Sequence, residues 1–191
     1  MLNIARLFRF SLALVAGALC SSGIQAQDAQ PKVKPIGAVV AGTDKQQAKP
    51  SPAATATGKA GKATVTVQYS SPAVKGRTIW GDLVPYGQVW RAGANEATTI
   101  TFDQPVTVEG KPLAAGTYAF FVLPTEQEWT LIFNKTAKQW GSFKYDDKQD
   151  ALRVAVKPRK AAAMNERLTY TVASPGLVLR WENLELPVAI K

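Results

Sequence analysis

Residues 116–123 read GTYAFFVL, and this stretch decides the fold class. Successive side chains of a strand point to opposite faces, so alternate residues of the stretch share a face. Both faces are apolar here, with Tyr118, Phe120 and Val122 on one and Ala119, Phe121 and Leu123 on the other. A strand of this kind must be covered on both sides, and we therefore expect it at the centre of a sheet.

Further strands are predicted around this stretch, because apolar residues recur at every second position in several short segments separated by turn residues. The predicted strands cover residues 63–69, 98–102, 106–109, 129–133, 152–156, 168–172, 177–181 and 186–190. Two weaker features are a short edge strand at 53–57 and a single helical turn within 159–166. The last strand contains Pro187, which favours an edge position.

No segment has a convincing amphipathic helix period, and no internal repeat of useful length is present. Many short strands with turns between them are typical of an all-β protein. The sequence predicts a single antiparallel β-sandwich, jelly-roll or Greek-key-like, or a barrel-like variant. We expect this domain to occupy residues 51–191.

The first 26 residues have the parts of a signal peptide. Arg6 and Arg9 supply positive charge, an apolar run follows at residues 10–19, and Ala26 ends a plausible cleavage site. The apolar run is shorter than the roughly 20 residues that a helix needs to cross a bilayer. We therefore predict export to the periplasm or the medium, with no transmembrane segment.

The only cysteine, Cys20, lies inside this predicted signal peptide. Lipid attachment at Cys20 is the less favoured alternative, because the bulky Leu19 precedes it. Cleavage near Ala26 would leave no cysteine, so we expect no disulfide framework.

The formal net charge of +9 comes mostly from the N-terminal part of the chain. Residues 27–50 are rich in Gln, Ala, Lys, Pro and Gly and are predicted to form a flexible, basic linker. Residues 63–191 retain only a small positive surplus, which gives little support to nucleic-acid binding. The sequence leaves the oligomeric state open.

The chain has no histidine, which excludes Ser-His-Asp and Cys-His catalysis and the usual zinc sites. Asp146, Asp147 and Asp150 lack the spacing of a calcium loop. No phosphate-binding glycine motif is present either. We therefore expect no metal and no cofactor, and the balance favours a protein that is not an enzyme.

The most unusual stretch is residues 74–99, VKGRTIWGDLVPYGQVWRAGANEATT. Its four glycines lie five or six residues apart, which predicts a folded excursion of turns. Polar and aromatic residues concentrate there, and the candidate ligand-binding residues are Arg77, Trp80, Asp82, Tyr86, Trp90, Arg91, Asn95 and Glu96. We expect the loop at 136–150 to lie over the segment 76–95.

Three hypotheses follow from the chemistry of these residues. In the leading one, the arginines bind a carboxylate or phosphate, and the aromatic rings offer flat faces to a sugar. The ligand would be small and anionic or sugar-like, or part of an envelope partner. In the second, the tryptophans fill the core and the arginines pair with Asp82 or Glu96, which makes the module purely structural. The third is a hydrolase that uses Glu96 with Asp82 or Asp150.

The segments that carry the unusual residues also resemble a known family. They are residues 70–102 (SSPAVKGRTIWGDLVPYGQVWRAGANEATTITF), 115–124 (AGTYAFFVLP), 128–135 (EWTLIFNK), 139–141 (QWG) and 177–183 (LVLRWEN). Over roughly residues 51–191 the chain resembles a bacterial family known as domain of unknown function 2911. The resemblance implies an exported protein of Gram-negative bacteria, and it implies no activity and no catalytic residue.

Overall fold

The computed structural model describes residues 50–191. The predicted signal peptide and the predicted linker up to residue 49 lie outside the described residues. The described residues belong to one compact unit.

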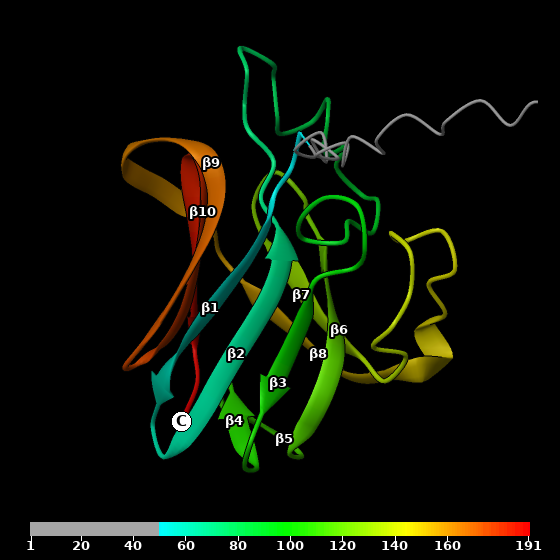
Figure 1. Ribbon diagram of the computed structural model, residues 1–191, viewed down its shortest axis with the longest axis vertical. Helices are drawn as coiled ribbons and strands as arrows, with labels where there is room; N and C mark the ends of the chain where they lie inside the picture. The colour runs from blue at the N-terminus through cyan, green and yellow to red at the C-terminus, as the bar shows by residue number, and fades with distance from the viewer. Residues whose placement is uncertain (1–49) are drawn as a thin grey trace, which may run out of the picture. The chain divides into compact units, whose positions relative to one another are not determined.

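Six strands form one antiparallel sheet, which we call the large sheet (Figure 1). In spatial order they are β1 (Ala53–Ala60), β2 (Ala63–Ser70), β3 (Thr99–Phe102), β6 (Gly116–Leu123), β7 (Trp129–Asn134) and β8 (Asp150–Val156). Neighbours in space follow chain order, so the sheet is a meander. The excursion at 74–98 connects β2 to β3 and rises above the sheet in Figure 1.

Two hairpins lie against the large sheet. One pairs β9 (Arg159–Ala173) with β10 (Gly176–Ala189), and the other pairs β4 (Val106–Val108) with β5 (Lys111–Leu113). A bridge between Val108 and Ile190 links the two hairpins. A 3-10 turn, η1 (Asp147–Gln149), is the only helical element among residues 50–191. The predicted all-β antiparallel class is confirmed.

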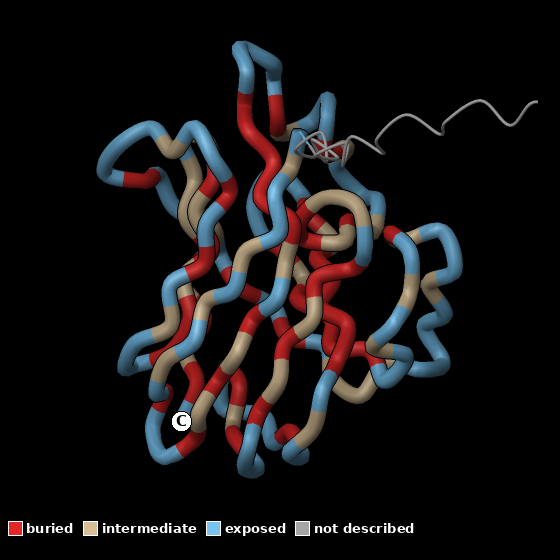
Figure 2. The backbone as a smooth tube through the Cα atoms, viewed as in Figure 1, coloured by how far each residue is buried: buried red, intermediate tan, exposed pale blue. Residues whose placement is uncertain are grey.

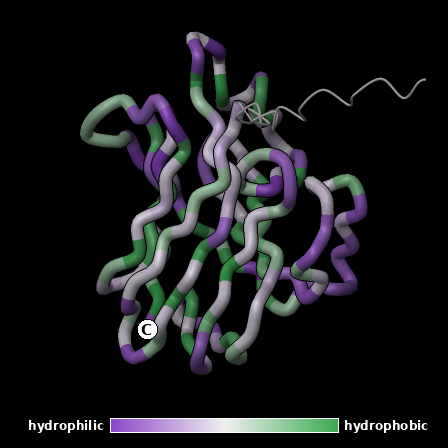
Figure 3. Tube along the Cα trace, viewed as in Figure 1, coloured by the Kyte–Doolittle hydropathy of each residue, from purple (hydrophilic) through white to green (hydrophobic). Residues whose placement is uncertain are grey.

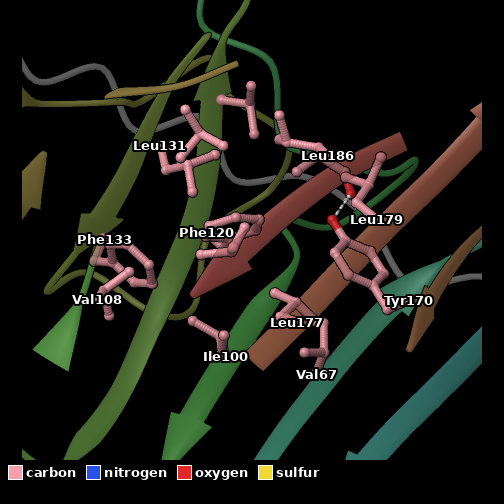
Figure 4. Close-up of a cluster of buried hydrophobic side chains, with 14 of the residues drawn as sticks. Val67, Ile100, Val108, Phe120, Leu131, Phe133, Tyr170, Leu177, Leu179 and Leu186 are labelled. Atoms are coloured by element: carbon pink, nitrogen blue, oxygen red, sulfur yellow. Dashed lines mark hydrogen bonds between the residues drawn. The ribbon is translucent and has the colours of Figure 1, made fainter. Parts of the chain in front are cut away.

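The main core lies between the large sheet and the β9–β10 hairpin (Figure 4). The sheet contributes Val67, Ile100, Phe120, Leu131 and Phe133, and the hairpin contributes Tyr170, Leu177, Leu179 and Leu186. In Figure 3 hydrophobic positions recur along these strands between paler ones, while the loop at 136–150 contains long hydrophilic stretches.

The central position predicted for residues 116–123 is confirmed. The five residues from Tyr118 to Val122 are all buried, and β6 pairs with β3 and β7 (Figure 2). The face that points away from the main core holds a second cluster, which includes Phe121 and Ile132. Tyr145, from the loop at 136–150, packs on Phe121 with ring centroids 5.3 Å apart. Both faces of the strand are therefore covered.

The C-terminal part differs from the sequence prediction. The helical turn expected within 159–166 is wrong, because this segment belongs to β9 and pairs with β10 near Leu184 and Glu185. The two strands expected at 177–181 and 186–190 belong to one element. The break between them is an irregularity in pairing, with Glu182 in the left-handed region at φ 53°.

The edge of the large sheet at β1 is covered by β9. Gly58 faces β9 so closely that an added Cβ would overlap the carbonyl oxygen of Val172. Only glycine allows this approach between the two backbones. The β9–β10 hairpin therefore covers the core and also protects a free sheet edge.

Candidate functional site

The excursion is fastened to the rest of the domain by main-chain hydrogen bonds. Trp90 and Val122 of β6 each donate a backbone N–H to the carbonyl of the other, at 2.8 and 2.9 Å. At its start, Val74 donates to the carbonyl of Glu166 in β9 at 2.7 Å. The excursion is thus an ordered platform attached to both layers of the fold.

Four tryptophans form a cluster at the base of the excursion. Trp80 lies 4.6 Å from Trp129 and 5.7 Å from Trp90, measured between ring centroids. Trp181 of β10 stacks on Trp90 with an interplanar angle of 17°. The indole nitrogens of Trp80 and Trp181 are buried without a hydrogen-bond partner in residues 50–191. Trp90, Trp129 and Trp181 are buried in the main core, and the half-buried Trp80 packs against it, as the structural hypothesis expects of tryptophans.

Three residues of the excursion that are not glycine, Lys75, Ala92 and Asn95, adopt a left-handed backbone, which is uncommon outside glycine. Ala92 has φ 53° and Asn95 has φ 58°. The carbonyl of Ala92 accepts hydrogen bonds from Thr98 Oγ1 at 3.0 Å and from the Tyr170 hydroxyl at 2.6 Å. The Asn95 amide donates to the Ser51 carbonyl at 3.2 Å and to Ser70 Oγ at 3.1 Å. Asn95 therefore anchors the excursion.

Arg77 is held by the main chain of its own turn. Its Nε donates to the carbonyl of Val74 at 3.0 Å, and a terminal nitrogen donates to that of Ala73 at 2.6 Å. These carbonyls fix the guanidinium plane, but they carry no formal charge that would neutralise it. No ion pair within residues 50–191 includes Arg77.

Arg91 is in an environment that disfavours its charge more than that of Arg77 does. Its side chain is half-buried, and its Nε is enclosed without a hydrogen-bond partner in the described part of the chain. Burial lowers the pKa of the Arg91 guanidinium, because desolvation disfavours the charged form. The pairing with Asp82 or Glu96 that the structural hypothesis requires is not seen within residues 50–191.

Both arginines line one small cleft, which we call the arginine cleft. Its volume is about 170 Å³, and its walls include Arg77, Trp90, Arg91 and Trp181. Gly93 lies in the same wall, where an added Cβ would come within 2.8 Å of Thr98 Oγ1. Sequence reasoning missed Trp181, because its place in an alternating apolar segment marked it only as a core residue.

The structure separates the other candidate residues from this cleft. Asp82 and Tyr86 are exposed and do not line the arginine cleft. Glu96 lines a different cleft of about 430 Å³, to which residues 50–191 contribute no second carboxylate. Asp150 instead accepts hydrogen bonds from the Tyr145 hydroxyl and from the amide of Asn134. Among the described residues, the two-carboxylate arrangement of the hydrolase hypothesis is therefore not formed at Glu96.

Residues 50–191 hold neither a metal-binding cluster nor a membrane-spanning helix. No group of three or more Asp, Glu, Cys or His side chains is arranged to hold a metal ion in this range. Within the same residues, no helix has the length and apolar character needed to cross a membrane.

Comparisons with known proteins complete the description of the site. No curated protein matches the chain, and no solved structure matches it. A family model does match, over residues 51–190, which is most of the chain and contains the whole excursion. The chain therefore belongs to the family described as "Protein of unknown function (DUF2911)".

Proposed function

We propose that the domain binds a small anionic ligand in the arginine cleft, and that it does so after export to the periplasm or the medium. The observation that carries this proposal is the state of Arg91. A half-buried guanidinium whose Nε lacks an acceptor among residues 50–191 is unfavourable unless a partner completes the site. A carboxylate or phosphate would supply both the missing acceptor and the opposite charge.

Arg77 supports the same ligand chemistry. Two main-chain carbonyls already hold its planar fork, so little side-chain entropy remains to be lost when an anion binds. Two cations that line one cleft, with no carboxylate partner in the described part of the chain, also repel each other. An anion between them would relieve this repulsion.

The size and the walls of the cleft narrow the class of ligand. About 170 Å³ is less than the roughly 300–1,000 Å³ of most small-molecule sites. The cleft therefore suits an anionic group with a few attached atoms, with the rest of the ligand outside. The indole rings of Trp90 and Trp181 favour an apolar stem next to the charge. A free organic acid and the anionic end of an envelope component would share this chemistry.

Thermal unfolding of the purified protein tests the proposal, with acetate, benzoate and inorganic phosphate as probes in chloride buffers of matched ionic strength. A ligand that binds only the folded state raises Tm by mass action. We expect benzoate to raise Tm more than acetate, and Arg91→Met to abolish both effects. The Arg91→Met protein itself should be as stable as wild type or slightly more stable, because it no longer buries an unpaired charge.

The matched control is Arg153→Met, which removes an exposed arginine on β8 and should leave the anion effect intact. A second variant, Arg77→Gln, should weaken the anion effect without unfolding the protein. The proposal is wrong if none of the three probes raises Tm, or if Arg91→Met and wild type respond equally.

Export rests on the charged and apolar segments of residues 1–26 and is tested separately. We expect a C-terminally tagged protein in a Gram-negative host to fractionate outside the cytoplasm with an N-terminus near Gln27. Recovery of the uncut chain from the cytoplasm would refute it and leave the binding proposal unaffected.

A further inference from the structure

The domain has a second cleft that the proposed anion site does not use. It lies where the main chain of Glu96–Ala97 meets Ala137–Gln139, beside β1 and β2, and its volume is about 430 Å³. This volume falls in the usual range for small-molecule sites. We call it the Gln139 cleft.

The lining of the Gln139 cleft mixes hydrogen-bond donors and acceptors around a floor of alanines. Besides Lys138, its polar residues are Thr55, Gln68, Tyr69, Ser70, Glu96, Thr99 and Gln139. Lys138 also lines it, so its charge and that of Glu96 are balanced, and no arginine of residues 50–191 takes part. A cleft of this composition suits a neutral ligand that is rich in hydroxyl groups, whereas the arginine cleft suits an anion.

Gln139 contributes a buried hydrogen-bond acceptor that lacks a donor among the described residues. Its amide nitrogen donates to the carbonyl of Thr136 at 2.7 Å, which fixes the orientation of the amide group. The amide oxygen is buried, and no group within residues 50–191 donates to it. Buried acceptors without partners are uncommon and costly, so such an atom points to a missing donor. A ligand hydroxyl would be such a donor.

An exposed aromatic ring stands beside the same cleft. The backbone of Trp140 pairs antiparallel with Glu96, and Ala97 donates its N–H to the carbonyl of Gln139 at 3.0 Å. This pattern makes Glu96 and Trp140 a non-hydrogen-bonded pair, whose side chains lie on one face and close together. Glu96 lines the cleft, and Trp140 directly follows the lining residues Lys138 and Gln139, so Trp140 lies beside the cleft without belonging to its lining. Trp140 is 58% exposed.

We propose that the Gln139 cleft binds a neutral pyranose ring, with Trp140 as the platform for its apolar face. The hydroxyl groups of the sugar would donate to the Gln139 amide oxygen and would accept from hydroxyl-bearing residues such as Tyr69. A sugar ring needs this combination, since one face presents C–H groups and its edge presents hydroxyls. The site does not depend on the arginine cleft, and either proposal can fail without the other.

NMR titration of the purified protein tests this site, with methyl glucoside, N-acetylglucosamine and cellobiose as probes. We expect at least one sugar to bind saturably and to shift the Trp140 indole N–H signal, which a Trp140→Phe variant identifies. Trp140→Ala should weaken binding by about tenfold or more, since it removes the stacking platform. Gln139→Met should also weaken it, because the acceptor is lost while the volume is kept.

Two control variants distinguish sugar binding at Trp140 from nonspecific contact with an exposed ring and from binding in the arginine cleft. Phe143→Ala removes an aromatic ring that is 82% exposed in the same loop and should leave affinity unchanged. Arg91→Met should also leave sugar binding unchanged. The proposal is overturned if no sugar binds, if Trp140→Ala binds as tightly as wild type, or if the linear polyol sorbitol binds as tightly as the sugars.

Discussion

The two long connections of this domain contain similar residues but place them in different environments. The excursion at 74–98 and the loop at 136–150 each contain tryptophan, glycine and basic residues. Yet Trp90 in the excursion is 8% exposed, and Trp140 in the loop is 58% exposed. The difference lies in their main-chain partners, since Trp90 pairs with the central strand β6 and Trp140 pairs with Glu96 of the excursion. In these two segments, the burial of an aromatic ring depends on the backbone segment with which its residue pairs, more than on the neighbouring glycines.

Each connection is also held by a tyrosine hydroxyl, in contrasting surroundings. Tyr170, in the buried core, donates to the carbonyl of Ala92 at 2.6 Å and so holds the excursion. Tyr145 donates to Asp150 at 2.5 Å in a half-exposed polar network that also contains Asn134. The excursion is thus fixed from the core, and the loop is fixed from the surface.

The largest expected effect comes from replacing each of the two tryptophans separately with alanine. Trp90→Ala should lower the free energy of unfolding by about 3–5 kcal/mol, because it removes a buried ring that stacks on Trp181. Trp140→Ala should change it by less than about 0.5 kcal/mol, as is usual for surface positions. Urea unfolding of both variants measures the difference. Equal losses would show that the loop carries as much of the core's stability as the excursion.

A smaller test removes each tyrosine hydroxyl. Tyr170→Phe should cost about 1 kcal/mol, since the Ala92 carbonyl loses one of two buried hydrogen bonds and keeps the one from Thr98. Tyr145→Phe should cost less at neutral pH, because Asp150 is still bound by Asn134 and lies near Arg153. Hydrogen exchange separates them, with faster exchange near Ala92 in the first variant and near Asp150 in the second. A larger loss of stability in Tyr145→Phe than in Tyr170→Phe would contradict the view that the excursion is the more firmly fixed connection.

Much of the fold could be predicted, because burial imposes a simple period on strands. Residues 116–123 gave the central strand, and the alternation at 63–69 and 129–133 gave its companions β2 and β7. The errors fall where tertiary pairing overrides local pattern. Residues 159–166 have no clear alternation, yet they extend β9 because β10 offers them a partner.

The candidate site was predictable in its location and only partly in its membership. Arginines and tryptophans in a glycine-rich excursion identified the segment, and Arg77, Trp90 and Arg91 do line one cleft. Asp82, Tyr86 and Glu96 do not, because turns in the excursion send neighbouring side chains to different sides. Trp181 joins the cleft from a strand about ninety residues away, and no spacing in a single sequence reports such a contact.

The smallest expected effect appears only in alkali and concerns the tyrosine of the loop. Burial raises the pKa of Tyr145, and its hydrogen bond to Asp150 raises it further, since a phenolate would face a carboxylate. Above a pH of about 10 an unfolded chain ionises its tyrosines, while the folded Tyr145 keeps its proton. The stabilisation that Tyr145 contributes is therefore complete below that pH and is lost as the pH rises toward the folded pKa. The difference in unfolding free energy between wild type and Tyr145→Phe should shrink over this range. A Tyr145→Phe difference that stays constant through alkaline pH would mean that the hydroxyl is free to ionise and that the surface network does not hold the loop.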